Sequence, residues 1–368
     1  MFKLFILMAF CYVCAAPSGW ERISPSLTMS FPRDHGAHLQ FQTEWWYVTG
    51  EVEDASGSQF GYQLTIFRRG LSPGNVTTGE KPLHVLAAHF AVVDLSKKKF
   101  NHTSRLRRLD GNLAFASEQK LHCFLEDWEI QQLQDGTIDV RASDAASETS
   151  IQFQLNIKKD AVLHGKNGYS QKGPDPGNAS AYLSWTRLAT RGTLQIQGKN
   201  LNITGESWFD HEWGTSQLAS GVVGWDWFGL RFDDGRELML YGLRRPDGTY
   251  LKQSGGTLID TVNIGNTVDK DGNGGKARSL TFDDFEMKPL AHWTSPATKG
   301  KYPIRWRIRI PGEKIELDVT AKINNSELDT SDSTGVIYWE GPVRVEGTHR
   351  GTGYMELTGY AGTLGGRF

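Results

Sequence analysis

Cysteine is scarce in this sequence, with 3 residues among 368. Cys11 and Cys14 lie in an N-terminal segment that we expect to be removed, which leaves Cys123 as the single thiol of the mature chain. One thiol cannot form an internal disulfide, so a large apolar core must stabilise the fold. Cys123 is then most simply a small buried hydrophobic residue, and an intermolecular disulfide is the alternative.

An excess of charge of either sign and long apolar runs are also missing. The 40 Lys and Arg residues nearly balance the 42 Asp and Glu residues. Nucleic-acid-binding proteins need clustered basic residues to neutralise phosphates, so the sequence predicts no nucleic-acid partner. Beyond the N-terminal segment no stretch approaches the roughly 20 apolar residues of a membrane-spanning helix, so no membrane partner is expected.

Three familiar functional motifs are absent or incomplete. No Gly-x-Ser-x-Gly elbow occurs, which argues against an α/β-hydrolase. His211 and Glu212 begin like a zinc-protease helix, but Thr215 stands where the second histidine ligand is needed. Asp269 opens a calcium-like loop, but Leu280 replaces the bidentate glutamate at its twelfth position. The sequence therefore predicts no metal and no organic cofactor.

The N-terminus resembles an export signal. Lys3 is followed by an apolar stretch over residues 4–13, and Val13 and Ala15 are small residues suited to a cleavage site. The signal is expected to cover residues 1–16. Five Asn-x-Ser/Thr sites, where about two are expected by chance, favour a secreted, extracellular glycoprotein. The predicted glycosylation sites are Asn75, Asn101, Asn178, Asn202 and Asn324.

Aromatic residues and alternating strand patterns are plentiful. The chain contains 12 Trp, 11 Tyr and 18 Phe, which supply the apolar surface for one or two cores. Apolar and polar residues alternate over 60–67, 149–157, 304–310 and 314–320, a pattern typical of strands with one dry face. Asp and Gly turn signals follow at 54–57, 135–136, 233–235 and 246–248. The sequence predicts an all-β protein whose antiparallel sheets close into barrels or sandwiches.

A weak internal repeat supports two related β domains. Both copies consist of an aromatic strand, an Asp/Gly turn and a strand that ends in two arginines. The copies run from Trp45 to Arg69 and from Trp225 to Arg245. The glycine- and proline-rich stretch 165–180 could link the two domains, but a long loop within the first domain fits equally well.

The densest group of chemically active residues lies in the sequences WFDHEWG at 208–214 and GWDWF at 224–228. In a strand, Asp210 and Glu212 point to one face and His211 points to the other. By the same alternation, Asp226 points to the face opposite Trp225 and Trp227. At least one ionisable group must therefore face inward. A carboxyl group among aromatic rings has a raised pKa and can donate a proton near neutral pH, and the same rings stabilise a cation. The alternative is a hydrogen-bonded structural network.

A second group of candidates surrounds these sequences. It comprises Glu44, which precedes WWY at 45–47, together with His89 and the YWE sequence at 338–340. These residues could contact a ligand or pack between domains. Arg68, Arg187 and Arg244 could simply pair with the nearby acids.

These sequences resemble signatures of the AttH-like, lipocalin-like family, which also contains acyclic carotenoid hydratases. The matching segments are EWWY at 44–47, FGYQLT at 60–65, DHEWG at 210–214, GWDWF at 224–228, YWEG at 338–341 and GYMELTGY at 353–360. Within the family, the branch of secreted fungal kievitone hydratases is the most similar. The resemblance implies two lipocalin-like antiparallel β-barrel domains packed together, over residues 17–215 and 216–368.

The resemblance also implies a reaction, the addition of water to the prenyl double bond of an isoflavonoid defence compound. The product is a tertiary alcohol formed through a carbocation. We predict Asp226 as the preferred proton donor, Asp210 or Glu212 as its rival, and His211 as the group that orients the water. Side chains predicted to bind or shield the substrate are Trp213, Trp225, Trp227, Glu44, Trp45, Tyr241 and Trp339.

Two other functions remain open at this point. The same barrel could carry an apolar ligand without catalysis, or it could catalyse a cyclisation or cycloaddition. In each case the expected partner is a small, apolar, prenylated molecule. No sequence pattern decides the oligomeric state, and a homodimer is left open.

Overall fold

The computed structural model describes residues 19–74, 79–175, 177–215, 218–261 and 277–362. The expected signal segment, the sequon at Asn75 and Asp269 of the calcium-like sequence lie outside these residues. Within them the chain is almost entirely strand, as the alternating pattern predicted. No helix in the described part has the length and apolar character needed to cross a membrane.

The elements follow one another as short antiparallel hairpins. Those of the first sheet, preceded by the 3-10 helix η1 (Arg33–His35), are β1 (Thr43–Asp54), β2 (Gln59–Ser72), β3 (Leu83–Asp94), β4 (Lys99–Arg108), β5 (Ala114–Ala116), β6 (His122–Leu125), β7 (Trp128–Gln132), β8 (Ile138–Asp144), β9 (Thr149–Ile157), β10 (Val162–Leu163), β11 (Tyr169–Gln171), β12 (Ala179–Ile196) and β13 (Lys199–Gly214). Those of the second are β14 (Gly224–Phe232), β15 (Glu237–Arg244), β16 (Gly255–Ile259), β17 (Ala277–Thr281), β18 (Glu286–Thr294), β19 (Lys301–Ile310), β20 (Ile315–Ala321), β21 (Glu327–Thr330), β22 (Val336–Gly347) and β23 (Gly351–Thr358), with the 3-10 helices η2 (Phe282–Asp284) and η3 (Pro311–Glu313).

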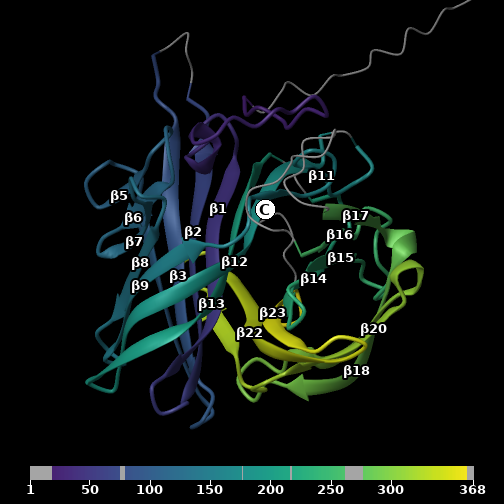
Figure 1. The fold of residues 1–368 in the computed structure, drawn as a ribbon. Coiled ribbons are helices and arrows are strands. Elements are labelled where there is room, and N and C mark those ends of the chain that lie inside the picture. The colour runs from purple at the N-terminus through teal and green to yellow at the C-terminus, as the bar shows by residue number, and fades with distance from the viewer. Residues whose placement is uncertain (1–18, 75–78, 176, 216–217, 262–276, 363–368) are drawn as a thin grey trace, which may run out of the picture.

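The first sheet curls into a nearly closed barrel (Figure 1). Its strand order is β4-β3-β2-β1-β13-β12-β9-β8-β7-β6-β5, and β10 and β11 pair with β12. Strand β6 lies close to β2, β3 and β4, so the two ends of the sheet approach each other. Such closure protects strand edges that would otherwise offer unpaired backbone groups.

The second sheet forms a half-barrel beside the first (Figure 1). Its order is β17-β16-β15-β14-β23-β22-β20-β19-β18, with β21 paired to β22. The fold is thus all-β with two lipocalin-like sheets, as predicted. Strand β13 ends at Gly214 and β14 begins at Gly224. The division into domains at residues 215 and 216 stays a prediction.

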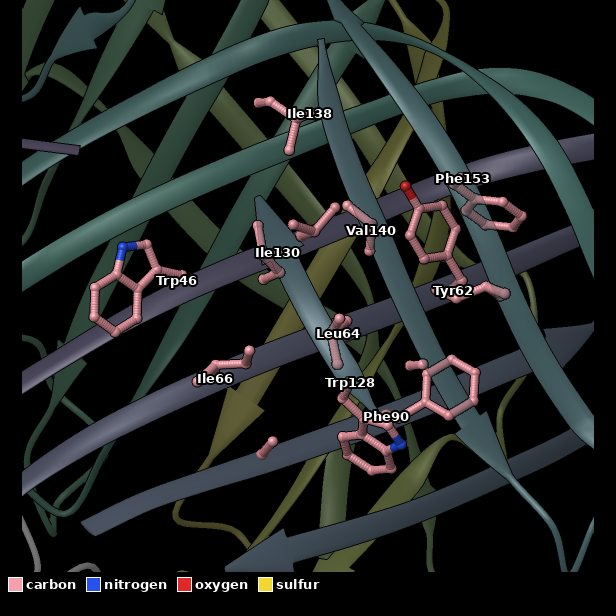
Figure 2. Packing of buried hydrophobic residues seen from close by; sticks show 14 of the residues in the cluster. Trp46, Tyr62, Leu64, Ile66, Phe90, Trp128, Ile130, Ile138, Val140 and Phe153 are labelled. Atoms are coloured by element: carbon pink, nitrogen blue, oxygen red, sulfur yellow. The ribbon is translucent and has the colours of Figure 1, made fainter. Parts of the chain in front are cut away.

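Alternation along the strands builds the core of the first barrel. On β1, Trp46 and Val48 point into the barrel, as do Leu64 and Ile66 on β2. Figure 2 shows Trp46, Leu64 and Ile66 packed together with residues from strands β3, β7, β8 and β9. The residues between them, such as Tyr47, point out of the barrel toward the second sheet.

The internal repeat occupies equivalent places in the two sheets. Its first copy forms the β1–β2 hairpin and its second copy the β14–β15 hairpin. The turns at 54–57, 135–136, 233–235 and 246–248 each contain a glycine with positive φ, as the turn signals predicted. Both hairpins contribute to the region where the outer face of the barrel meets the second sheet.

Candidate functional site

A large cavity lies between the two sheets and measures about 1120 Å³, including its open mouth. Aromatic side chains form most of its walls. The first sheet contributes Trp45, Tyr47, Phe67 and Tyr182, and the second contributes Trp225, Trp227, Tyr241 and Tyr338. An apolar cleft with a few polar groups is the usual form of a small-molecule site.

The cavity walls follow from strand alternation. On β13, Asp210 and Glu212 face the cavity, whereas His211 between them faces the barrel core. On β2, Gln63 and Phe67 face the cavity while the intervening Leu64 fills the barrel. The sequence predicted this separation of faces, and the structure shows which face meets the cavity.

Asp210 is buried in the cavity wall and surrounded by hydrogen-bond donors. Tyr182 Oη donates to Oδ2 over 2.9 Å, and Trp208 Nε1 donates to Oδ1 over 2.6 Å. Ser184 Oγ also donates to Oδ1. Burial raises the pKa of Asp210 to about 7, although the three donated hydrogen bonds oppose that rise. Both carboxyl oxygens are therefore already held by protein groups.

Glu340 on β22 and Glu356 on β23 form a pair of neighbouring carboxyl groups in the cavity. They are directly opposite one another in the antiparallel ladder. Trp225 Nε1 and Thr358 Oγ1 each donate to Glu356 Oε1 over 2.9 Å. Burial raises the pKa of Glu356 to about 7.

Glu340 accepts a single hydrogen bond from the protein, whereas Glu356 accepts two. Tyr47 Oη donates a hydrogen bond to Oε1. Oε2 has no hydrogen-bond partner among the described residues, although the side chain is only 2% exposed. Burial, followed by the nearby Glu356 carboxyl group, raises the pKa of Glu340 well above its ordinary value. Burial therefore favours the protonated form of Glu340, and no protein group in the described chain hydrogen-bonds to its Oε2.

Glu212 lies elsewhere in the cavity and has a basic partner. Lys172 Nζ lies 3.3 Å from Glu212 Oε1 and 3.9 Å from the centre of the Tyr241 ring. Burial alone would lower the pKa of Lys172, but the charge of Glu212, the hydrogen bond to it and the neighbouring Tyr241 and Asp210 together raise that pKa. Glu212 therefore has a cation beside it, unlike Glu340 in the described part of the chain.

A polar group borders the cavity near Tyr338. Its hydroxyl lies 2.8 Å from His89 Nδ1 and accepts a hydrogen bond from Gln63 Nε2 over 3.1 Å. Burial lowers the pKa of His89 to about 3, so the imidazole is neutral. Of the second group of sequence candidates, His89, Tyr338 and Glu340 therefore all reach the cavity.

Asp226 does not line the cavity, which corrects its predicted role as the preferred proton donor. Arg244 Nη1 donates to its Oδ1 over 2.8 Å, and the hydroxyl groups of Tyr250 and Tyr360 complete its partners. Its side chain is fully buried in this group. The aspartate is occupied by a structural ion pair, the alternative that the sequence left open for Arg244.

His211, Glu44 and Trp213 also lie outside the cavity, contrary to their predicted roles. They belong to a closed polar group at the end of the first barrel. Glu44 Oε1 accepts from His211 Nε2 over 2.9 Å, and Oε2 accepts from Arg68 Nε over 2.8 Å. The ring of Trp213 stacks on His38. His211 faces the core because its strand neighbours Asp210 and Glu212 face the other way.

This closed group is also the place where a metal could be considered. His38, Glu44 and His211 each offer a ligand atom, and these atoms lie within 4.8 Å of one another. However, Arg68 already pairs with Glu44, and the pKa of that carboxyl group is held well below its usual range despite burial. A metal ion here would face the Arg68 guanidinium, so the residues fit a structural ion pair better than a metal site.

The remaining residues predicted from the sequence also fall into those that line the cavity and those that lie elsewhere. Trp45, Trp225, Trp227 and Tyr241 line the cavity, and their role in substrate binding stays a prediction. Trp339 instead fills the core of the second sheet. Among the sequons in the described chain, Asn202 and Asn324 are exposed, while Asn101 and Asn178 are half-buried.

Sequence reasoning missed several cavity residues. Lys172 and Tyr182 carried no distinguishing pattern, because they reach the site only through strand pairing. Glu356 stood within one of the recognised sequence signatures but was not singled out. Gln63 could have been found from the sequence. It is a polar residue between two apolar ones on a well-buried strand, and a buried polar side chain needs a hydrogen-bond partner.

Comparisons with known proteins relate this architecture to one family. A family model described as AttH-like matches residues 22–360. The crystal structure of an AttH homologue from Nitrosomonas europaea is 32% identical, covers 92% of this chain and 99% of its own, and has a TM-score of 0.81. Kievitone hydratase from Nectria haematococca is 14% identical, with coverages of 94% and 98% and a TM-score of 0.66, which is a likeness of fold. No curated protein gave a significant match.

Proposed function

The chain belongs to the AttH-like family, and we propose that it is a hydratase that adds water across a carbon–carbon double bond of an apolar substrate. The substrate class we propose is a prenylated isoflavonoid of the kievitone type, converted to a tertiary alcohol and thereby detoxified. The expected setting is extracellular, with the exposed sequons at Asn202 and Asn324 open to glycosylation. Kievitone hydratase shares the fold and supplies the substrate to test.

The observation that supports this proposal most directly is the environment of Glu340. Alkene hydration needs an acid that keeps its proton at neutral pH and can present it to carbon. Glu340 has a strongly raised pKa, no basic partner among the described residues, and an oxygen that no protein group occupies. Asp210 and Glu356 also have pKa values raised to about 7, but donors already engage both oxygens of Asp210, and Glu356 accepts two hydrogen bonds where Glu340 accepts one.

In the proposed reaction the acid gives one proton to the alkene and receives one from water. The Glu340 carboxyl group transfers its proton to the less substituted alkene carbon, and the π electrons form the new C–H bond. The other carbon becomes a tertiary carbocation. Water adds to it through oxygen, and its proton returns to the Glu340 carboxylate. Substrate and water are consumed, and the acid is regenerated.

The aromatic walls suit this intermediate. Rings attract a cation through their quadrupoles, by up to about 2 kcal/mol each when water is excluded. Trp225, Trp227 and Tyr47 all line the same cavity as Glu340. Tyr47 also holds Glu340 Oε1 and so fixes the orientation of the carboxyl group. The rings therefore stabilise the charge that Glu340 creates.

The test is turnover of kievitone in oxygen-18 water by the wild type and by Glu340→Gln. The amide keeps the shape of the side chain but cannot supply a carboxylic proton. We expect one labelled hydroxyl group in the wild-type product and a turnover rate about 10²- to 10⁴-fold lower in the variant. Glu346→Gln is the matched control, because this residue lies on the same strand with its side chain 56% exposed.

Other outcomes separate the alternatives. Wild-type activity in Glu340→Gln would refute the assignment of the proton donor. Tight binding of kievitone by the wild type without labelled product would indicate a carrier. A product of unchanged mass would indicate a cyclase.

A further inference from the structure

Lys172 and Glu212 place a pair of opposite charges in the wall of the cavity. Lys172 Nζ lies 3.3 Å from Glu212 Oε1, and the two side chains are 8% and 7% exposed. A buried ion pair adds little to stability, because removing both charges from water costs about as much as their attraction returns. The proposed reaction uses neither charge. In a cavity wall, such a pair is suited to recognising a polar group on a ligand.

Lys172 reaches the cavity from the glycine- and proline-rich stretch 165–180. It directly follows β11, which pairs with β12 of the first sheet. Its backbone N–H donates to the Asn178 carbonyl oxygen over 2.7 Å. From the same stretch, Ser170 Oγ lies 3.4 Å from Tyr241 Oη on the second sheet. Contacts with both sheets therefore fix the position from which the Lys172 side chain enters the cavity.

Two tyrosine rings accompany the Lys172 ammonium group. Nζ lies 3.9 Å from the centre of the Tyr241 ring and 5.0 Å from that of Tyr182. Aromatic faces attract a cation but do not satisfy its hydrogen bonds as an oxygen does. An ammonium group has three N–H donors, and within the described chain Glu212 is the one carboxyl group at ion-pair distance. Lys172 therefore retains N–H donors for a ligand.

Glu212 supplies an acceptor next to these donors. Ser180 Oγ donates to Oε1, the same oxygen that faces Lys172. Oε2 accepts no hydrogen bond from the residues that the structure describes. A hydroxyl group matches this arrangement, because it accepts from Lys172 and donates to Glu212 at the same time. An anionic ligand group matches it poorly, since the Glu212 carboxylate repels it.

The ladder between β1 and β13 separates this ion pair from the proposed acid. Tyr47, which donates to Glu340, is directly opposite Asp210. Glu212 stands two residues further along β13, opposite Trp45, whose ring also lines the cavity. Two residues span about 7 Å along a strand. The cavity therefore has its ion pair and its acid at different positions along the same strands.

We infer that Lys172 and Glu212 bind a phenolic hydroxyl group of the substrate and so select prenylated phenols, an inference that rests on the proposed function. Lys172 Nζ donates to the phenol oxygen, and the phenol O–H donates to Glu212 Oε2. The hydroxylated ring lies beside Trp45, and the prenyl group extends toward Glu340. No proton changes owner at this contact, so the two residues determine specificity and are not catalytic.

The affinities of two ligands that differ by a single hydroxyl group test this inference. The probes are 2-prenylphenol and prenylbenzene, and titration calorimetry measures both Kd values. We expect the wild type to bind the phenol about ten- to a hundredfold more tightly, as for hydrogen bonds to charged groups. The double variant Lys172→Met with Glu212→Gln keeps the approximate shape of both side chains and leaves no unpaired charge. We expect it to lower this preference at least about fivefold.

A matched control and the readout of turnover complete the test. Lys166→Met, which changes an exposed lysine of the same stretch, should keep the wild-type preference. No preference of the wild type for the phenol, or an unchanged preference in the double variant, would refute the phenol site. Equal weakening of both ligands would also refute it, because a general structural defect does not distinguish them. The expected preferences without a labelled alcohol from 2-prenylphenol or kievitone in oxygen-18 water would support the phenol site and refute the proposed hydration.

Discussion

Asp226 and Glu340 are buried carboxyl groups on strands of the second sheet, yet their surroundings give them different chemistry. Arg244 and two tyrosines surround Asp226, so its charge is balanced and its oxygens are occupied. Glu340 has a tyrosine on one oxygen and no partner on the other within the described chain. Burial raises the pKa of both groups, but Arg244 opposes the rise at Asp226, whereas no cation of the described chain opposes it at Glu340.

At the residue scale, Asp210 should make stability depend on pH. Its pKa is 3.8 in the unfolded reference and about 7 in the folded protein. Between these values the unfolded chain releases a proton that the folded chain retains, so stability falls as pH rises. We expect Asp210→Asn to gain up to about 4 kcal/mol of unfolding free energy relative to wild type between pH 4 and pH 8.

Urea unfolding at several pH values measures this difference. Glu118→Gln, which changes an exposed acid in a surface bend, should follow the wild-type profile. A constant difference between Asp210→Asn and wild type across the pH range would show that Asp210 is ionised in the folded protein throughout.

At the element scale, strand pairing explains the internal repeat. It also explains why Glu44 and Asp226 form ion pairs and do not line the cavity. Glu44 is opposite Arg68 in the first hairpin and pairs with it. Asp226 lies on the equivalent strand of the second hairpin and pairs with Arg244 from the neighbouring strand. Both acids therefore have matching structural roles, which the repeat implied once the strands were aligned.

Close contact between strands β1 and β13 gives a second prediction. A Cβ added to Gly205 would lie 2.1 Å from the carbonyl oxygen of Glu51. This oxygen belongs to the backbone, so it cannot move aside as a flexible side chain could. We expect Gly205→Ala to lower the free energy of unfolding by about 1 to 3 kcal/mol, as for other overpacked sites. Denaturant unfolding measures it. Gly312→Ala is the control, since nothing lies within 4 Å of its added Cβ, and an equal loss in both variants would contradict the steric explanation.

At the scale of the whole molecule, a largely buried ionic group joins the two sheets. Glu237 on β15 accepts from Lys159 over 2.7 Å and from Arg187 over 2.8 Å. Arg187 also donates to Glu206 over 2.9 Å. The cavity exists only while the sheets stay together, so this group supports the site indirectly.

Removing the central charge should therefore destabilise the protein. We expect Glu237→Gln to lower the free energy of unfolding by about 3 to 5 kcal/mol, because Lys159 loses its carboxylate partner and Arg187 keeps only the more exposed Glu206. The neighbouring Asp234 provides the control, since its side chain is 43% exposed beside Arg236. Asp234→Asn should change stability by at most about 1 kcal/mol. Thermal or urea unfolding followed by tryptophan fluorescence compares the two, and similar losses would refute a special role for the buried group.

Local patterns were enough to predict much of the fold. Alternation predicted the strands, Asp and Gly predicted the hairpin turns, and the aromatic signatures indicated the family. Alternation also separated Asp210 and Glu212 from His211 on β13. These features depend on residues a few positions apart, whose geometry the backbone determines directly.

The candidate site depended on contacts that no local pattern contains. Tyr47 and Glu340 are 293 positions apart, and Gln63 and Tyr338 are 275 apart. Whether an acid faces a cation, a cavity or a core is decided by the strands that pack beside it. The sequence by itself thus determined strands, faces and family. Only the tertiary structure decided that Asp226 is paired with Arg244 while Glu340 is buried without a cation in the described chain, because burial and charge pairing act through space.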